Sequence, residues 1–192
     1  MKILLLCDRA SGGADNGAPV GDLRGALIDL LTDAGHEVET VTLNWENTKP
    51  CVGCFGCWLK TPGKCVISND GANETAAAHI RSGAIVALTE ITFGGFSADI
   101  KSYLDRSIQN IAADFEVYKG EMRHKMRYDS FPIWAAVGYG DVSDAERRTF
   151  AELAQRNSLN MRPKDFLALT VNENAPIDEA GRAILKLLEA SA

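Results

Sequence analysis

The feature that most constrains the fold is a regular alternation of short apolar runs with longer amphipathic segments. Five runs read as strands, at 3–7, 37–43, 84–89, 132–138 and 166–171. Helical segments are expected between and after them, from about 19 to 34, from 72 to 81, from 98 to 111, after 143 and from about 177 to 188. Alternation at this pace predicts a parallel sheet covered by helices on both faces.

Capping residues mark several helix boundaries. Ser97 is a good N-cap, and Ser143 with Glu146 three residues later forms a capping box. Ile100, Leu104, Ile108 and Ile111 repeat at helical spacing and predict one continuous helix face. Residues 112–131 show no clean period, so we expect an excursion from the main fold there.

Bulk properties limit the class of protein. With 192 residues, we expect a single domain spanning 1–192. The net charge of −6 and pI near 5.1 argue against a general nucleic-acid binder. No run is long enough to span a bilayer, and the apolar N-terminal run is too short for a signal peptide. These features predict a cytoplasmic protein with reduced cysteines.

Four of the five cysteines fall in one stretch, with spacing C-x2-C-x2-C-x7-C: Cys51, Cys54, Cys57 and Cys65. Gly53 and Gly56 let the backbone curl so that successive sulfurs face one point. An iron–sulfur cluster, a zinc site and redox-active thiols all fit such a run. Reduced thiols in a packed loop are the further alternative. The spacing favours the cluster over zinc, which usually takes two separated pairs.

In folds of this kind, ligands sit at the carboxyl ends of the strands. In the loop from Thr89 to Ser97, the two glycines permit close approach of a flat ring, two phenylalanines flank it, and the serine adds a donor. These candidates are Phe93, Gly94, Gly95, Phe96 and Ser97. An ordinary strand-to-helix turn is the alternative reading of the same residues.

The loop after the first strand is a candidate phosphate site. Arg9, Ser11 and the helix start near Pro19 supply the donors, although Asp8 and Asp15 would repel a phosphate if they pointed inward. The loop matches neither the P-loop nor the G-x-G-x-x-G pattern. No Ser/His/Asp or paired-carboxylate arrangement is evident, so no catalytic side chain is assigned.

Three segments resemble one superfamily. Phe93-Gly-Gly-Phe-Ser-Ala-Asp-Ile-Lys-Ser-Tyr-Leu-Asp-Arg106 resembles the flavin-ring loop and following helix of flavodoxin-like NAD(P)H-dependent FMN reductases. The cysteine run resembles the compact motif of the iron–sulfur flavoproteins. Arg123-His-Lys-Met-Arg-Tyr128 resembles a segment of the multimeric flavodoxin type. The resemblance implies an α/β three-layer sandwich with a five-stranded parallel sheet in the order 2-1-3-4-5.

The resemblance also implies a cofactor site and partners. FMN would meet Thr89 and 93–97 on one side of its ring and Gly138, Tyr139 and Gly140 on the other. Its phosphate would meet Arg9, Ser11, Pro19 and Val20. The four cysteines would hold a [4Fe–4S] cluster. NAD(P)H would donate electrons to a quinone, another small acceptor or a redox protein, and the protein would be a homodimer or homotetramer.

The sequence departs from the family pattern at two places. Glu90 follows Thr89 where relatives often have proline, and Cys7-Asp8-Arg9 replaces the usual Gly-Ser-x-Arg of the phosphate loop. Ala18-Pro19-Val20 replaces the usual Ser-x-Thr at the helix start, so hydroxyl donors are lost. Two alternatives therefore stay open: a non-enzymatic electron carrier with flavin and cluster, and a flavodoxin-like protein that has lost its cofactor.

Overall fold

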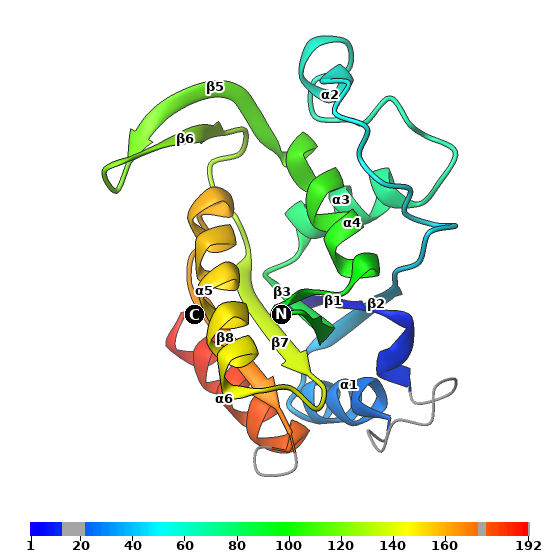
Figure 1. The fold of residues 1–192 in the computed structure, drawn as a ribbon, viewed down its shortest axis with the longest axis vertical. Helices are drawn as coiled ribbons and strands as arrows, with labels where there is room; N and C mark the ends of the chain where they lie inside the picture. The colour runs from blue at the N-terminus through cyan, green and yellow to red at the C-terminus, as the bar shows by residue number, and fades with distance from the viewer. Residues whose placement is uncertain (13–21, 173–175, 192) are drawn as a thin grey trace.

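The main sheet of the computed structural model, which describes residues 1–12, 22–172 and 176–191, has five parallel strands (Figure 1). They run β2-β1-β3-β7-β8 across the sheet, so the predicted order 2-1-3-4-5 is confirmed. The bounds are β1 Lys2–Cys7, β2 Glu37–Thr42, β3 Ala84–Thr92, β7 Ile133–Tyr139 and β8 Phe166–Val171.

Helices cover both faces of this sheet. They are α1 Leu23–Asp33, α3 Ala72–Arg81, α4 Ala98–Arg106, α5 Asp144–Met161 and α6 Ile177–Ala190. Alternate residues of β1 point to opposite faces: Leu5 packs with α1 and α6, while Leu4 packs with α3, α4 and α5. Both faces are apolar, which explains why the central strands read as continuous apolar runs.

The helix boundaries agree with the capping residues, with one correction. The Ser97 side chain caps α4, and the capping box of Ser143 and Glu146 opens α5. The single helix expected from 98 to 111 is wrong. α4 ends at Arg106, a 3-10 helix follows over Ser107–Asn110, and Ile111 begins the next strand. Ile108 and Ile111 therefore lie beyond the α-helix, in the segment that leads into the excursion.

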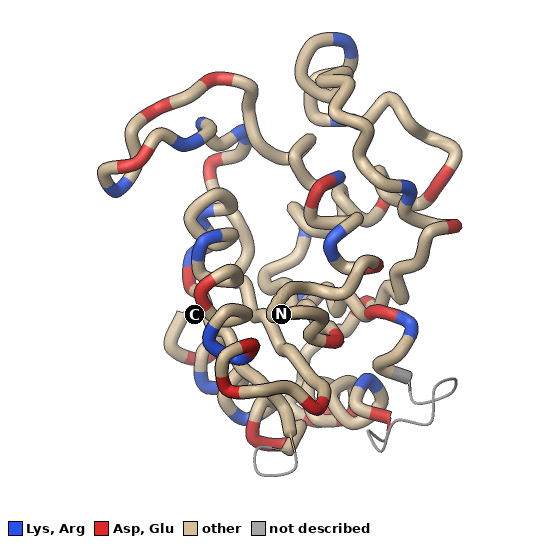
Figure 2. The backbone as a smooth tube through the Cα atoms, in the orientation of Figure 1, with Lys and Arg blue, Asp and Glu red and all other residues tan. Residues whose placement is uncertain are grey.

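The excursion is a two-stranded antiparallel hairpin of β5 (Ile111–Tyr118) and β6 (Glu121–Met126), standing away from the main sheet (Figure 1). Its turn residues Lys119 and Gly120 both have positive φ, as a two-residue type I′ turn requires. Figure 2 shows charges of both signs along the hairpin and on α5. Arg156 pairs with Glu121 at 2.7 Å, tying the hairpin to α5.

Within the described part of the chain, no helix is both long and apolar enough to cross a bilayer.

Candidate cofactor sites

The expected loop after the third strand is instead a tight hairpin. β3 continues to Thr92, and the chain returns through β4 (Gly95–Phe96), which pairs antiparallel with β3. Phe93 and Gly94 form the turn with φ of +50° and +75°. Such a turn needs positive φ at both central positions, which glycine adopts freely and phenylalanine does not.

Of the two phenylalanines in this hairpin, only Phe93 is open to a ligand. Its side chain is 94% exposed, whereas Phe96 is buried against Phe150 with ring centroids 5.2 Å apart. Gly94 lies so close to Thr149 that an added Cβ would sit 2.9 Å from its side chain. The turn is therefore held against α5 and presents the Phe93 ring to solvent.

Thr89 and Ser97 stabilise the β3–β4 hairpin through buried hydrogen bonds. Both are buried, and the Ser97 N–H donates to the Thr89 hydroxyl at 2.9 Å. The Ser97 hydroxyl accepts from the Ile100 N–H at the start of α4. A ligand at this turn would therefore meet the backbone and Phe93 more readily than these two hydroxyls.

The end of β7 lies beside this turn. Gly138 is required by packing, because an added Cβ would lie 2.7 Å from Ile91 and 2.8 Å from Phe150. Tyr139 is buried and donates its hydroxyl to the Asp8 carboxylate. Burial, and then this contact, raise the pKa of the Tyr139 hydroxyl far above its usual range. Gly140, with φ of +132°, directly follows the last residue of β7.

A buried carboxylate occupies the end of β1. Asp8 is 2% exposed and accepts hydrogen bonds from the Glu90 N–H at 2.6 Å and the Ser11 N–H at 3.1 Å, besides the Tyr139 hydroxyl. Two backbone donors that would suit an anion are thus directed at the protein's own carboxylate. The sequence raised the concern that Asp8 would point inward, and it does.

The described residues that were predicted to bind the phosphate, Arg9 and Ser11, already have partners within the protein. Arg9 pairs with Asp99 at 3.0 Å, and the buried Ser11 donates its hydroxyl to the Asp8 carbonyl at 2.8 Å. Pro19 and Val20 lie outside the described residues. The ring-binding part of the predicted site fits a flavin through Phe93 and the turn, whereas the described phosphate-binding part carries an internal negative charge.

The four cysteines of the motif line one pocket, beside a short helix α2 (Gly56–Leu59). Its walls are mainly apolar and include Phe55, Trp58 and Ile108. Cys57 and Cys65 are each 8% exposed, whereas Cys51 and Cys54 are exposed. All five cysteines of the chain are free thiols in this structure.

The four cysteines lie near enough to influence one another electrostatically. Burial raises the pKa of the Cys57 thiol, and the neighbouring thiols of Cys65, Cys51 and Cys54 raise it further. Within the described ranges, no group of three or more His, Cys, Asp or Glu side chains is placed so that it could hold a metal ion. A [4Fe–4S] cluster presents four irons and takes one thiolate at each, so convergence on a shared pocket is what it needs.

Arg106 supplies a second observation in favour of a bound group. Its side chain is 1% exposed, lines the cysteine pocket and forms an ion pair at 2.9 Å with the Asp70 carboxylate, a side chain that is itself 0% exposed. Its terminal nitrogens also donate to the carbonyls of Lys49 and Ile67. Its Nε is buried and has no partner among the described residues. A buried unpaired N–H beside four thiols fits a sulfur acceptor there.

Polar residues remote in sequence hold the cysteine loop in place. Trp58 donates its indole N–H to the carbonyls of Ile108 and Ile111, at 3.2 and 3.1 Å. The Cys65 N–H donates to the side chains of Asn73 and Gln109, at 2.9 and 3.0 Å. Sequence reasoning assigned no role to these residues, because nothing local links them to the motif.

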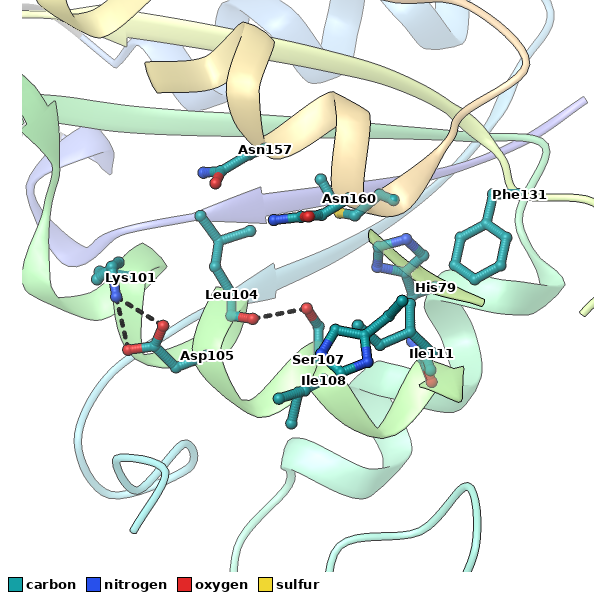
Figure 3. Close-up of a pocket in the computed structure, with 13 residues that line it drawn as sticks. His79, Lys101, Leu104, Asp105, Ser107, Ile108, Ile111, Phe131, Asn157 and Asn160 are labelled. Carbon is teal, nitrogen blue, oxygen red and sulfur yellow. Dashed lines mark hydrogen bonds and ion pairs between the residues drawn. The ribbon is translucent and has the colours of Figure 1, made fainter. Parts of the chain in front are cut away.

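A second pocket, of about 330 Å³, lies between α4, α5 and the base of the β5–β6 hairpin. In Figure 3, Asn157 and Asn160 reach toward it from α5, and Leu104, Ser107 and Ile108 line the opposite wall. Ile108 also lines the cysteine pocket, so the two pockets are neighbours. The sequence indicated the helices but not this space between them.

Known proteins show what this chain resembles. No protein-family model matches it. An iron–sulfur flavoprotein of Methanocaldococcus jannaschii is 32% identical over 80 residues, covering 42% of this chain and 40% of the relative. Another from Methanosarcina thermophila is 29% identical over 98 residues, covering 51% and 50%. The matches thus span half or less of these relatives' length.

Solved structures share the fold along the whole chain. An NAD(P)H:quinone oxidoreductase from Methanothermobacter marburgensis superposes with a TM-score of 0.60 at 13% identity, covering 100% of this chain and 95% of the other. An FMN-dependent NADH-azoreductase from Bacillus anthracis, solved with FMN, gives 0.57 at 11% identity, covering 100% and 98%. The flavodoxin-like architecture is confirmed by these shared folds. The resemblance to iron–sulfur flavoproteins is confirmed over the part of the chain that the two relatives match.

Proposed function

We propose that the protein is an FMN-dependent oxidoreductase that passes electrons from NAD(P)H to a quinone, another small acceptor or a redox protein. The fold shared with the quinone oxidoreductase and the azoreductase supports it, as does the partial match to iron–sulfur flavoproteins. Bound FMN would supply the hydride chemistry, which explains why no catalytic acid or base is needed.

Phe93 is the single observation that carries the proposal. A phenylalanine at φ of +50° with 94% of its side chain exposed is unfavourable in two ways. Local strain kept at the carboxyl end of a central strand points to function rather than stability. A flavin ring packed on Phe93 would bury the exposed side chain, and the backbone N–H groups of the turn are available to its polar edge.

We further propose that Cys51, Cys54, Cys57 and Cys65 hold a [4Fe–4S] cluster. The shared pocket, the mutual effect of the thiols on the Cys57 pKa and the unpaired Arg106 Nε support this ligand set. α4 links the two sites, since Ser97 caps its start and Arg106 ends it beside the cysteines. α4 has nine residues, so the helix that separates the two proposed sites is about 13 Å long.

A second candidate function is a flavodoxin-like protein without cofactor, and Asp8 is the observation that favours it. Its buried carboxylate takes two backbone donors that a phosphate would otherwise use. An electron carrier with no nicotinamide site is the remaining alternative, and it differs from the enzyme only in lacking steady NAD(P)H oxidation.

The oligomeric state belongs to the same proposal. Phe115, Val117 and Met122 of the hairpin are 59%, 70% and 66% exposed. We infer that a second copy of the chain covers this apolar surface, giving a homodimer or homotetramer. Light scattering coupled to size exclusion tests it, and Val117→Asp should lower the molar mass if the hairpin forms the interface. A wild-type monomer at every concentration would contradict the inference.

The decisive experiment is an absorption spectrum of anaerobically purified protein, with iron and acid-labile sulfide assayed on the same sample. We expect a flavin spectrum with broad additional absorbance, about four irons per chain, and NAD(P)H oxidation with an added acceptor. Cys57→Ser should lose the iron and keep the flavin, whereas Cys7→Ala, outside the motif, should keep both.

The flavin part has its own control. Phe93→Ala should weaken FMN binding, while Trp45→Ala, which truncates another exposed aromatic side chain, should not. A colourless protein that binds no added FMN would refute the oxidoreductase and support the cofactor-free alternative. Flavin and iron without steady NAD(P)H oxidation would support the carrier.

A further inference from the structure

The pocket between α4, α5 and the hairpin is built from parts of the chain that are far apart in sequence. Its volume of about 330 Å³ lies within the usual range for small-molecule sites. Its apolar lining comes from α4, the 3-10 helix, β5, α5 and the segment before β7: Leu104, Ile108, Ile111, Phe131 and Met161. Apolar walls on several sides suit a flat, largely apolar ligand.

Several polar side chains that line this pocket have one partner or none within the described residues. The side-chain amide of the half-buried Asn157 has no partner there, and the exposed side chain of Asn160 has one hydrogen bond, which its oxygen accepts from Arg123. His79 is 3% exposed and bonds Tyr103 through Nδ1, leaving Nε2 without a partner in the described ranges. The buried His124 Nδ1 is likewise unpaired in the part of the chain described. Amide and imidazole groups of this kind hydrogen-bond to carbonyl oxygens.

The pocket carries no net charge that would select an ion. Lys101 and Asp105 at its rim pair with each other at 2.6 Å and are about half exposed. Burial lowers the pKa of His79 to about 4, so its imidazole is neutral near pH 7. A neutral ligand with polar atoms at its edges therefore fits better than a phosphate or a carboxylate.

The pocket also lies against the cysteine loop. Ile108 lines both pockets, and Trp58 of the loop packs on His124 with ring centroids 4.8 Å apart. A compound bound here would be separated from the cysteine pocket by a single layer of side chains.

We propose that this pocket binds a neutral, planar dicarbonyl compound of the quinone class. Its role as the electron acceptor rests on the function proposed above. In the net reaction, NAD(P)H gives up a hydride, which is two electrons and one proton, and becomes NAD(P)⁺. The quinone takes the two electrons and two protons, the second from water, and leaves as the hydroquinone.

Calorimetric titration of the oxidised, anaerobically purified protein with tetramethyl-1,4-benzoquinone tests the binding. This ring has no free position to which the exposed thiols of Cys51 and Cys54 could add. We expect Asn157→Leu to weaken binding at least tenfold, because a buried carbonyl loses its donor. Gln155→Leu, an exposed position on the same helix, should leave the dissociation constant unchanged.

A second measurement needs no variant. In ¹⁵N spectra of histidine-labelled wild-type protein, the quinone should shift the imidazole resonances of His79 and leave those of His36 unmoved. Unmoved His79 resonances, or equal affinities in Asn157→Leu and wild type, would overturn the site.

Kinetics separates this site from the function on which it rests. With NAD(P)H as donor, Asn157→Leu should raise the KM for the quinone and leave the rate with ferricyanide unchanged. Protein that oxidises NAD(P)H with ferricyanide but binds no quinone would overturn the pocket alone. Protein without flavin would overturn the oxidoreductase, and the acceptor role of the pocket with it.

Discussion

His79 makes the stability of this fold depend on pH in a way that can be calculated. The imidazole is almost fully buried, and its hydrogen bond is to Tyr103. Burial lowers the pKa from 6.5 to about 4. Because the folded-state pKa is the lower one, the unfolded chain takes up the proton first as pH falls. The neutral imidazole therefore favours the fold fully above pH 6.5, and this contribution is lost as pH falls toward 4.

The size of the effect follows from the two pKa values. Each pKa unit corresponds to 1.36 kcal/mol, so between pH 7.5 and 4.5 the free energy of unfolding should fall by about 2.5 kcal/mol on account of His79. Urea unfolding across this range should show the fall in the wild type. His79→Asn, which keeps a polar group near the Nδ1 position, should lack it.

The pH dependence of the unfolding free energy is compared between the wild type and His79→Asn. The difference separates the contribution of His79 from that of the carboxylates that titrate in the same pH range. His36→Asn is the matched control. Partial burial and the N-terminal amino group also lower the pKa of His36, but this side chain lies at the surface. His36→Asn should therefore keep most of the wild-type dependence of the unfolding free energy on pH. Parallel curves for wild type and His79→Asn would refute the reasoning, since they would mean that the imidazole ionises equally in both states.

Three further predictions concern the candidate sites. Gly138→Ala should destabilise the protein by about 1–3 kcal/mol in urea unfolding, because the new Cβ would lie 2.7 Å from Ile91; an unchanged midpoint would contradict the packing argument. Asp8→Ser should tighten FMN binding by about tenfold or more in fluorescence titration, since removing a charge near a phosphate is worth on the order of 1–2 kcal/mol; equal or weaker binding would place the phosphate elsewhere. Arg106→Lys should lower the midpoint potential of the cluster by about 30–60 mV, a three- to tenfold change for one electron, at unchanged iron content. Arg127→Lys, whose Nε already donates to the Gln109 carbonyl, should not shift it.

The order of elements and the sheet could be predicted from sequence because their signals are local. Apolar runs bounded by turn residues gave the strands, and the capping residues Ser97 and Ser143 began their helices where expected. The cysteine motif indicated a shared pocket for the same reason, since three of its members lie within seven residues. When residues are only a few positions apart in the sequence, their spacing largely determines which side chains can meet.

Tertiary contacts decided the rest. The helical spacing that ends in Ile108 and Ile111 did not produce one helix, because the chain changes to a 3-10 helix after Arg106 and enters the β5–β6 hairpin at Ile111. Asp8 gained its distant partners Glu90 and Tyr139 only when β1, β3 and β7 came together in the sheet.

The site residues show the same division. Local signals in the sequence predicted the alternation of strands and helices and the presence of a cysteine-rich loop, whereas the strand order followed from the family resemblance. Tertiary packing placed Arg106 beside that loop, with a nitrogen that has no partner in the described part of the chain, and enclosed a neighbouring pocket between α4, α5 and the hairpin. Periodicity reports which face of an element is buried, whereas the partner that buries it is chosen by segments distant in sequence.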